Sequence, residues 1–398
     1  MIDGKEKRFK KKINIAILCV AIFFFACIIF LAKRYFLSSI FLGDNSVREF
    51  FKNQNNDFID IYKADQNNFF VCLGNKIKLI DIANNKEIWS DDLNFISGSN
   101  ELILQCKKKI FAVSDIKSNR IVVYNLAGKL YEIKMDIGES LLAFFINKSG
   151  DLVYISNKKN IYNICVYNKL GEKVFTNIYS EENIFPVSAD VSPDGKILAI
   201  VYADLNDIEV VSKVVFINLG DNEHVFASLQ EKNNFIYGVS FVASKKIILL
   251  STQQVICENI DQNRISEKWR INFNKSASDI EFNKRFLIAK FDSEDKKNNI
   301  KNGNMIYVYS VDSGNKINTF SLGSDVNFMS LDRKLDYVLL TGHNGFFIID
   351  LTSNRFLHNR ANGIGDYKKA YFLNKKGEIV FLSNDKISIM THDIFQRR

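Results

Sequence analysis

The stretch that decides the fold is Lys76-Ile-Lys-Leu-Ile-Asp-Ile-Ala-Asn-Asn-Lys-Glu-Ile-Trp89. Apolar and polar residues alternate up to Asp81, a short polar turn follows, and a second short strand ends on the aromatic Trp89. Alternation at a period of two residues is typical of a strand with one buried face. The stretch therefore predicts a β-hairpin.

Degraded copies of this hairpin recur along the chain, at residues 122–131, 165–175, 215–226, 306–317 and 347–357. Most copies carry Asp or Asn where the first strand meets its turn. Aligning the copies on this position places it at Asp81, Asn125, Asn168, Asn218, Asn259, Ser310 and Asp350, with spacings of 44, 43, 50, 41, 51 and 40 residues. An eighth, weaker strand, Lys386–Met390, follows at a similar interval.

A period of about 44 residues that holds about four strands is typical of a β-propeller, in which four-stranded blades pack radially around a channel. Ser140–Ile146 and Asp151–Ile155 are examples of the expected inner strands. Leucine-rich and hexapeptide solenoids need much shorter repeats, and a sandwich would not keep this register of hairpins. We therefore predict an all-β propeller of eight four-stranded blades, or of seven if the hairpin around Asn259 is an insertion.

The last repeat, from Ala370 to Met390, supplies only three clear strands. A ring cannot close on an incomplete blade without exposing an unpaired strand edge. Asp57–Tyr62 is the first strand-like stretch after the N-terminal region, so we predict that it completes the last blade.

The N-terminal region predicts a membrane anchor. Ile13–Ala32 contains no charged residue and only one polar residue, Asn14, and twenty residues of helix can cross a bilayer core of about 30 Å. A cleaved signal peptide, the alternative, would have a shorter apolar core and a small-residue cleavage site. Six basic residues precede the segment and two follow it closely, which predicts a cytoplasmic N-terminus.

These patterns divide the chain into a basic cytoplasmic tail at residues 1–12, a transmembrane helix at 13–33, a juxtamembrane stalk at 34–56 and an extracytoplasmic propeller at 57–398. Within the stalk, Val47–Phe51 is interpreted as a short amphipathic helical turn. An equally good interpretation is that the stalk continues the first helix and frays.

Charge argues against a nucleic-acid partner. The net charge is +8, and residues 1–34 contribute +6 of it through eight basic residues against two acidic ones. The remainder of the chain is nearly neutral, whereas nucleic-acid-binding domains usually carry a broad basic surface. The basic tail suits the anionic headgroups of a bilayer instead.

Two short motifs carry a family resemblance. Asp81 through Trp89 and Glu267-Lys-Trp269 resemble PQQ-like repeats, and Val191-Ser-Pro-Asp-Gly-Lys-Ile-Leu-Ala199 is similar to the turn of WD40-like and TolB-like propellers. With one N-terminal anchor, the layout resembles uncharacterised clostridial membrane proteins of the DUF5711 type. Quinone-dependent propeller enzymes carry a vicinal cysteine pair that this chain lacks, so the resemblance implies no quinone cofactor.

No catalytic, cofactor-binding or metal-ligating residue is predicted. Cys72, Cys106, Cys165 and Cys257 lie in or beside strands without metal-ligand spacing, and we interpret them as core residues, with one disulfide or a metal site as alternatives. The four histidines are isolated, and His343 lies in an expected turn. Asn362-Gly-Ile-Gly-Asp366 is interpreted as a turn rather than a phosphate-binding loop.

The sequence thus favours a cell-membrane protein, held by the bilayer through residues 13–33, whose extracytoplasmic propeller binds protein or cell-envelope partners. It is predicted not to be an enzyme. The alternative is an envelope hydrolase or lyase with a site at the mouth of the channel, because polar residues distant in sequence can converge there.

Overall fold

The computed structural model describes residues 47–52, 59–95, 102–206, 208–220, 224–261, 264–292, 304–332, 336–342, 345–360, 367–373, 378–383 and 386–391. The predicted tail at 1–12 and the predicted membrane helix at 13–33 lie outside these ranges, as does His343. Among the described residues, no helix is long and apolar enough to cross a membrane.

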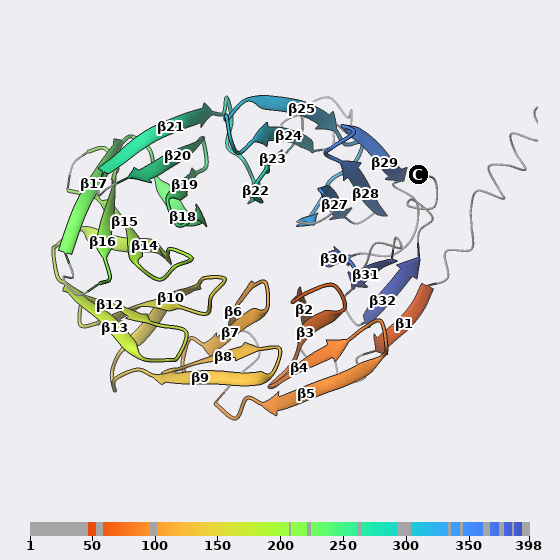
Figure 1. Ribbon diagram of the computed structural model, residues 1–398, viewed down its shortest axis with the longest axis horizontal. Coiled ribbons are helices and arrows are strands. Elements are labelled where there is room, and N and C mark those ends of the chain that lie inside the picture. Colours follow the sequence, from red (N-terminus) through yellow and green to blue (C-terminus); the bar gives the residue numbers. More distant parts are fainter. Residues whose placement is uncertain are drawn as a thin grey trace, which may run out of the picture.

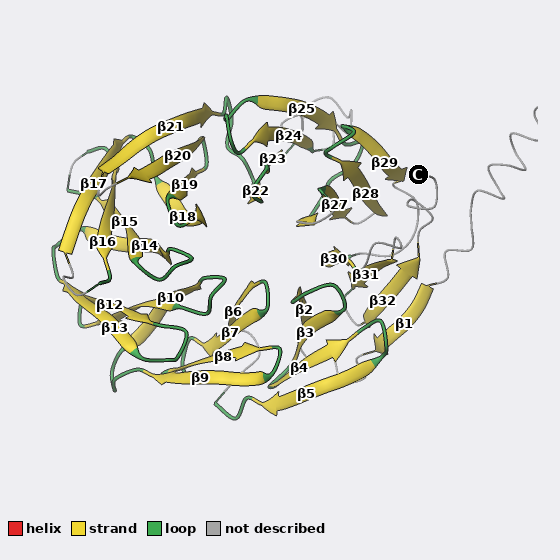
Figure 2. Cartoon of the chain, viewed as in Figure 1, coloured by secondary structure: helices red, strands yellow, loops and turns green. Residues whose placement is uncertain are grey.

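Eight antiparallel four-stranded sheets stand around a central axis (Figures 1 and 2), which confirms the eight-bladed alternative over the seven-bladed one. We number the blades 1 to 8 in chain order. Blades 1 to 4 consist of β2 (Ile59–Lys63), β3 (Asn68–Leu73), β4 (Lys76–Asp81) and β5 (Lys86–Asp92); β6 (Leu102–Lys107), β7 (Ile110–Asp115), β8 (Arg120–Asn125) and β9 (Gly128–Lys134); β10 (Ser140–Ile146), β11 (Leu152–Lys158), β12 (Ile161–Tyr167) and β13 (Lys173–Tyr179); and β14 (Ile184–Val191), β15 (Ile197–Asp204), β16 (Val211–Asn218) and β17 (His224–Lys232).

Blades 5 to 8 follow the same order, from the innermost strand to the outermost. They consist of β18 (Ile236–Ala243), β19 (Lys246–Ser251), β20 (Gln254–Asp261) and β21 (Arg264–Asn272); β22 (Asp279–Phe282), β23 (Phe286–Phe291), β24 (Met305–Ser310) and β25 (Lys316–Ser321); β26 (Phe328–Asp332), β27 (Tyr337–Gly342), β28 (Gly345–Asp350) and β29 (Arg355–Arg360); and β30 (Lys369–Phe372), β31 (Glu378–Leu382), β32 (Lys386–Thr391) and β1 (Val47–Lys52).

The recurring hairpin forms the third and fourth strands of each blade. The quoted stretch is β4 and β5, in which Leu79 lies opposite Trp89 and the register then shifts. A register shift of this kind occurs in all eight pairs of third and fourth strands. Because a bulge increases the local twist, the outermost strand of every blade can cross the inner strands obliquely, as Figure 1 shows.

Closure of the ring uses a different strand from the one that we predicted. The strand that completes blade 8 is β1, whose Val47 lies opposite Met390 and whose Lys52 lies opposite Lys386. The prediction that Asp57–Tyr62 closes the ring is therefore wrong, because β2 is the innermost strand of blade 1 and pairs with β3. The helical interpretation of Val47–Phe51 is also wrong, and β1 lies inside the range expected for the stalk.

The core is a ring of eight apolar layers, one between each pair of neighbouring blades. The layer between blades 8 and 1, for example, contains Val380 and Ile387 against Phe69 and Val71, all fully buried. Each blade thus buries both of its faces, which explains why second and third strands read as nearly continuous apolar runs in the sequence.

The aromatic residue at the end of the hairpin motif joins neighbouring blades. Nε1 of Trp89 donates to the carbonyl oxygen of Leu126 in blade 2 at 3.1 Å, and Nε1 of Trp269 donates to that of Val311 in blade 6 at 3.0 Å. Gly314, with a φ of +72°, lies directly against the Trp269 ring. The turn of one hairpin and the aromatic residue of the preceding blade's hairpin therefore form one contact between blades.

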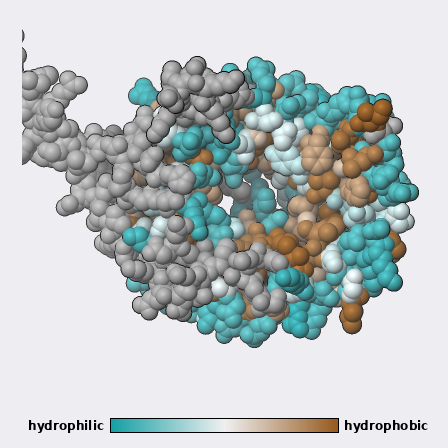
Figure 3. Space-filling model, turned by 180° about the vertical axis from the view of Figure 1, so that it is seen from behind, coloured by the Kyte–Doolittle hydropathy of each residue, from teal (hydrophilic) through white to brown (hydrophobic). Residues whose placement is uncertain are grey.

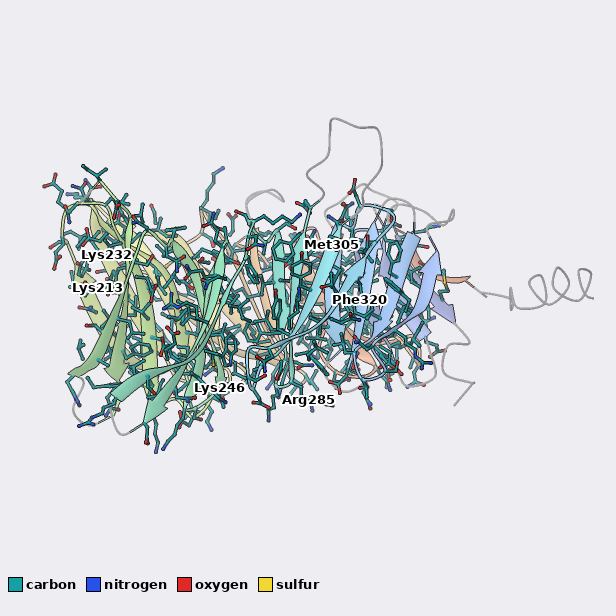
Figure 4. All side chains as sticks on the ribbon, turned by 90° about the horizontal axis from the view of Figure 1, so that it is seen from above. Lys213, Lys232, Lys246, Arg285, Met305 and Phe320 are labelled. Carbon is teal, nitrogen blue, oxygen red and sulfur yellow. The ribbon has the colours of Figure 1, made fainter. Side chains whose placement is uncertain are left out.

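Every innermost strand begins at the same face of the ring, which we call the upper face, and ends at the opposite, lower face. In Figure 4, Lys232 and Met305 lie toward the upper face, and Lys246 and Arg285 toward the lower face. Because β1 runs antiparallel to β32, the chain enters the propeller at Val47 on the lower face and leaves it at Thr391 on the same face.

Candidate functional site

Two regions of the propeller gather residues suited to binding: the wall of the central channel, and the upper face over blades 2 to 5. The innermost strands form the channel wall. Polar side chains that extend from these strands toward the channel therefore determine the chemistry of the wall.

Ion pairs at the channel wall hold blade 1 to the last two blades. Nζ of Lys369 in β30 lies 2.8 Å from the Asp60 carboxylate and 3.9 Å from the centre of the Tyr62 ring. Nζ of Lys63 lies 2.8 Å from Oδ2 of Asp332 in blade 7. Burial, followed by the charge of Asp60, raises the pKa of the Tyr62 hydroxyl, which therefore stays protonated.

Polar side chains of one blade also bond the exposed backbone edge of the next blade. Oδ2 of Asp190 in β14 accepts from the backbone nitrogen of Phe241 at 2.8 Å, and Oγ of Ser188 accepts from that of Val239 at 3.3 Å. Desolvation raises the pKa of Asp190 to about 6 in spite of the hydrogen bonds that it accepts. An innermost strand has no ladder partner on its channel side, so these bonds satisfy backbone groups that would otherwise be unpaired.

Three carboxylates of the innermost strands are thus engaged in structural contacts. Asp60 and Asp332 pair with lysines, and Asp190 accepts backbone hydrogen bonds. Within the described ranges, no group of three or more His, Cys, Asp or Glu side chains could hold a metal ion.

The cysteines lie where the sequence places them, inside strands. Cys72, Cys165 and Cys257 are buried, Cys106 is half-buried, and none of the four forms a disulfide with another described residue. Burial raises the pKa of Cys72 to about 12, with a further contribution from Asp60, and that of Cys257 to about 11. A thiol with a raised pKa is a poor nucleophile at neutral pH, which supports a packing role for these two residues.

A small cavity of about 230 Å³ opens on the lower face between blades 3 and 4. Asp151 in its wall accepts from Nδ2 of Asn147 at 2.7 Å and from the backbone nitrogen of Lys169 at 2.9 Å. Both carboxylate oxygens are therefore engaged, and the cavity is smaller than the pockets of about 300–1,000 Å³ that usually hold small ligands.

The upper face carries the other region, which we call the upper-face patch. It consists of exposed large apolar side chains at the upper ends of strands and in upper loops of blades 2 to 5: Ile116, Ile137, Leu142, Ile161, Ile178, Phe185, Leu205, Ile208, Phe235 and Tyr237. Ile137 and Ile208 are 91% and 106% exposed at loop tips. Figure 3, which views this face, shows apolar side chains bordering one side of the channel mouth.

The lower face has no comparable concentration among the described residues. Its exposed large apolar side chains, Ile88, Leu130, Leu170, Val225 and Ile317, are spread over five blades. Sequence reasoning missed the patch, although one signal was available: Ile137 and Ile208 are single apolar residues in turn segments, where no strand period requires them.

Comparison with known proteins agrees with the fold. A family model described as a family of unknown function, DUF5711, matches residues 42–391, a range that includes β1 and ends at the last residue of β32. No curated protein matches the sequence. The crystal structure of the computationally designed protein Ika8 is similar, with a TM-score of 0.58, 12% sequence identity, and coverage of 86% of this chain and 99% of that one. At this identity the likeness shows the fold alone.

Proposed function

We propose that this chain, which belongs to the DUF5711 family of unknown function, is a binding or scaffold module that contacts protein or cell-envelope partners through its upper-face patch. The single observation that carries the proposal is the concentration of ten exposed large apolar side chains on one face of four consecutive blades. Single exposed apolar residues are common on soluble proteins, but contiguous apolar surface usually marks an interaction site.

The proposed topology explains how this face would be presented. With residues 13–33 as a membrane anchor and the N-terminus in the cytoplasm, residues 34–46 connect the bilayer to Val47 on the lower face. Thirteen extended residues span at most about 45 Å. The anchor would therefore attach on the lower face at blade 8, which leaves the upper face clear of the tether and open to partners.

The contacts of three carboxylates at the channel wall support binding over the alternative, an envelope hydrolase or lyase. Such an enzyme needs a general acid or base within reach of a substrate. Asp60, Asp190 and Asp332 are held instead by lysines or backbone nitrogens. Their positions fit a role in holding the blades together.

Cross-linking in membranes tests the binding function. A photo-reactive residue placed at Ile137 or Ile208 in the full chain should give discrete cross-linked species, and Ile137→Asp with Ile208→Asp should abolish cross-linking from a third patch position. Leu170, exposed on the lower face, provides the matched control because Leu170→Asp should leave cross-linking unchanged. Equal cross-linking from the patch variant and the parent chain would contradict the proposal.

A protease test addresses the topology separately. Protease added to intact spheroplasts should cut propeller loops or residues 34–46. Protection of the propeller until the membrane is lysed would mean that the proposed orientation is wrong.

A further inference from the structure

Lysines gather on the lower face of blades 2 and 3, and we call this group the lower basic patch. Its members come from the lower turns of the two blades and from the strand ends beside them: Lys107, Lys108, Lys109, Lys129, Lys148, Lys169 and Lys173. On the described lower face of these blades, Glu172 is the one exposed acidic side chain. The patch therefore carries a strong local positive charge, although the chain after residue 34 is nearly neutral.

The turns that carry these lysines converge on Gly150 in blade 3. A Cβ atom built on this glycine would lie 3.7 Å from Cβ of Lys169 and from Cδ1 of Ile110, and 3.9 Å from Cδ1 of Leu130. Ile110 and Leu130, both in blade 2, each directly follow a lysine of the patch, and Gly150 itself lies two residues after another. The lysines of the two blades thus share one continuous surface.

Contacts within the propeller neutralise only part of this charge. Glu132 lies 2.5 Å from Nζ of Lys129. The Asp151 carboxylate is buried beneath the patch, where it accepts from Asn147 and from a backbone nitrogen rather than from a lysine side chain. Three members of the patch are exposed and form no ion pair with a described residue: Lys108, Lys109 and Lys169. Their ammonium groups therefore face solvent and are open to an anionic surface.

The chain enters the propeller on the same face. Val47 lies at the lower end of blade 8, and only blade 1 separates blade 8 from blade 2 (Figure 1). Residues 34–46, which connect Val47 to the proposed membrane helix, span at most about 45 Å. The lower face is therefore within reach of the bilayer surface, whose anionic headgroups attract lysines at short range.

From this charge and this point of entry, and resting on the proposed membrane anchor, we propose that the lower basic patch docks on the anionic headgroups of the bilayer that holds the chain. One attachment at Val47 leaves the orientation of the propeller undetermined. A second contact at the patch fixes it, because the anchor keeps the lysines at high effective concentration near the headgroups. In the docked state, the upper-face patch points away from the bilayer.

The upper face of the same two blades suits a bilayer less well. Its exposed basic side chains are Lys117, Arg120, Lys134, Lys158 and Lys159, and its exposed acidic side chains are Asp136, Glu181 and Glu182. The acidic side chains would be repelled by anionic headgroups. A polyanionic wall polymer would also be attracted by the lower basic patch, but the bilayer is favoured because the anchor already holds the patch beside it.

Photo-cross-linking to lipid tests the docking. The full chain is reconstituted into vesicles of phosphatidylcholine, alone or mixed with phosphatidylglycerol, with a photo-reactive residue at Ala127, which is exposed in the lower turn between β8 and β9. Each lysine near an anionic surface favours docking about fivefold. Cross-linking to lipid from Ala127 should therefore be at least about tenfold stronger in the anionic vesicles at low salt, and should fall as salt is added. A photo-reactive residue at Ile137 on the upper face should give little lipid cross-linking in either vesicle.

Removal of charge from the patch should undo the docking. The patch variant neutralises the three exposed lysines without an ion pair: Lys108→Gln, Lys109→Gln and Lys169→Gln. Docking in the anionic vesicles should weaken on the order of 100-fold, since three contributions of about fivefold are lost. The matched control removes the same charge from exposed upper-face lysines: Lys134→Gln, Lys159→Gln and Lys232→Gln. It should cross-link to lipid like the parent chain, and thermal unfolding verifies that both variants are folded.

Several results would overturn the inference. Equal lipid cross-linking from Ala127 in the two kinds of vesicle would do so, as would equal cross-linking from the patch variant and the control variant. Cross-links in cells from Ala127 to a wall polymer, and none to lipid, would assign the lysines to that polymer instead. In each case, cross-links from the upper-face patch to a partner would leave the proposed binding function standing. If the full chain does not float with vesicles of either kind, the proposed anchor and the docking fall together.

Discussion

Lys369 and Asp60 lie near opposite ends of the propeller sequence and meet at the channel wall, with Nζ 2.8 Å from Oδ1. Asp60 is in the innermost strand of blade 1 and Lys369 in that of blade 8, so the pair lies at the point where the ring closes. The two side chains are only 13% and 21% exposed. Removal of one partner would therefore leave a poorly solvated charge.

We expect Lys369→Met to destabilise the fold by about 1–3 kcal/mol, less than the loss of a fully buried pair because some solvent reaches the site. Lys369→Met combined with Asp60→Leu should recover part of that loss, since no unpaired charge remains. Chemical denaturation of the two single variants and the double variant measures the coupling. Additive losses would show that the pair contributes nothing by itself.

Closure by β1 gives a second prediction. Successive residues of a strand direct their N–H groups to opposite sides, so Arg48→Pro with Glu49→Pro must remove at least one hydrogen bond to β32. The loss should be about 3 kcal/mol or more, visible as a midpoint of thermal unfolding several degrees lower. Arg48→Ala with Glu49→Ala is the control, and deletion of residues 396–398 should have little effect. Equal midpoints for the proline and alanine variants would contradict the role of β1 in closing the ring.

Gly314 gives a third prediction. A Cβ atom at this position would lie 2.9 Å from the Trp269 ring, and the φ of +72° disfavours any residue with a side chain. Gly314→Ala should therefore cost roughly 2–4 kcal/mol from overpacking and backbone strain together. Gly323→Ala is the matched control, because a Cβ there meets no atom within 4 Å. A similar urea midpoint for the two variants would mean that the contact between blades 5 and 6 accommodates the added methyl group at little cost in stability.

A fourth prediction concerns Glu258, which lies in the layer between blades 4 and 5. The side chain is 4% exposed, and its Oε2 atom has no hydrogen-bond partner. The nearby Arg270 is held by Glu231 and Glu267, each at 2.7 Å. Burial, together with the charge of Glu267, raises the pKa of Glu258 to about 7, although Arg270 opposes the shift.

The sign of the pH dependence follows from this shift. Folded Glu258 binds its proton more tightly than unfolded Glu258, so the folded state is favoured at low pH and loses stability as the pH rises from about 4.5 to 7. The loss is on the order of 2–3 kcal/mol. Glu258→Gln should remove this dependence and be more stable than the parent chain at pH 8. Urea denaturation between pH 5 and 8 measures both proteins, and parallel stability profiles would contradict the raised pKa.

The sequence predicted eight blades, with seven as the alternative, because most repeats end the third strand on a recognisable polar residue before a turn. Asp81, Ser310 and Asp350 all end such strands in the structure. The sequence was not sufficient to identify the strand that closes the ring. Alternation identifies a strand but not its partner, and Val47-Arg-Glu-Phe-Phe51 lacks clean alternation because a register shift falls between Glu49 and Phe51.

The upper-face patch could not be predicted for a different reason. Its residues come from loops and strand ends of four blades, and each is unremarkable alone. Leu142, Phe185 and Tyr237 also occupy strands, where an apolar residue is normally assigned to the core. Only the arrangement of the blades around the ring shows that these side chains share one exposed face.

The position of β1 has a mechanical consequence. In the proposed anchored topology, tension between the bilayer and a partner on the upper face enters the propeller at Val47 and acts along the β1 axis. The hydrogen bonds between β1 and β32 lie across that direction, so they are loaded together in shear rather than opened one after another. The seam that closes the ring is thus oriented to withstand stretching of the tether.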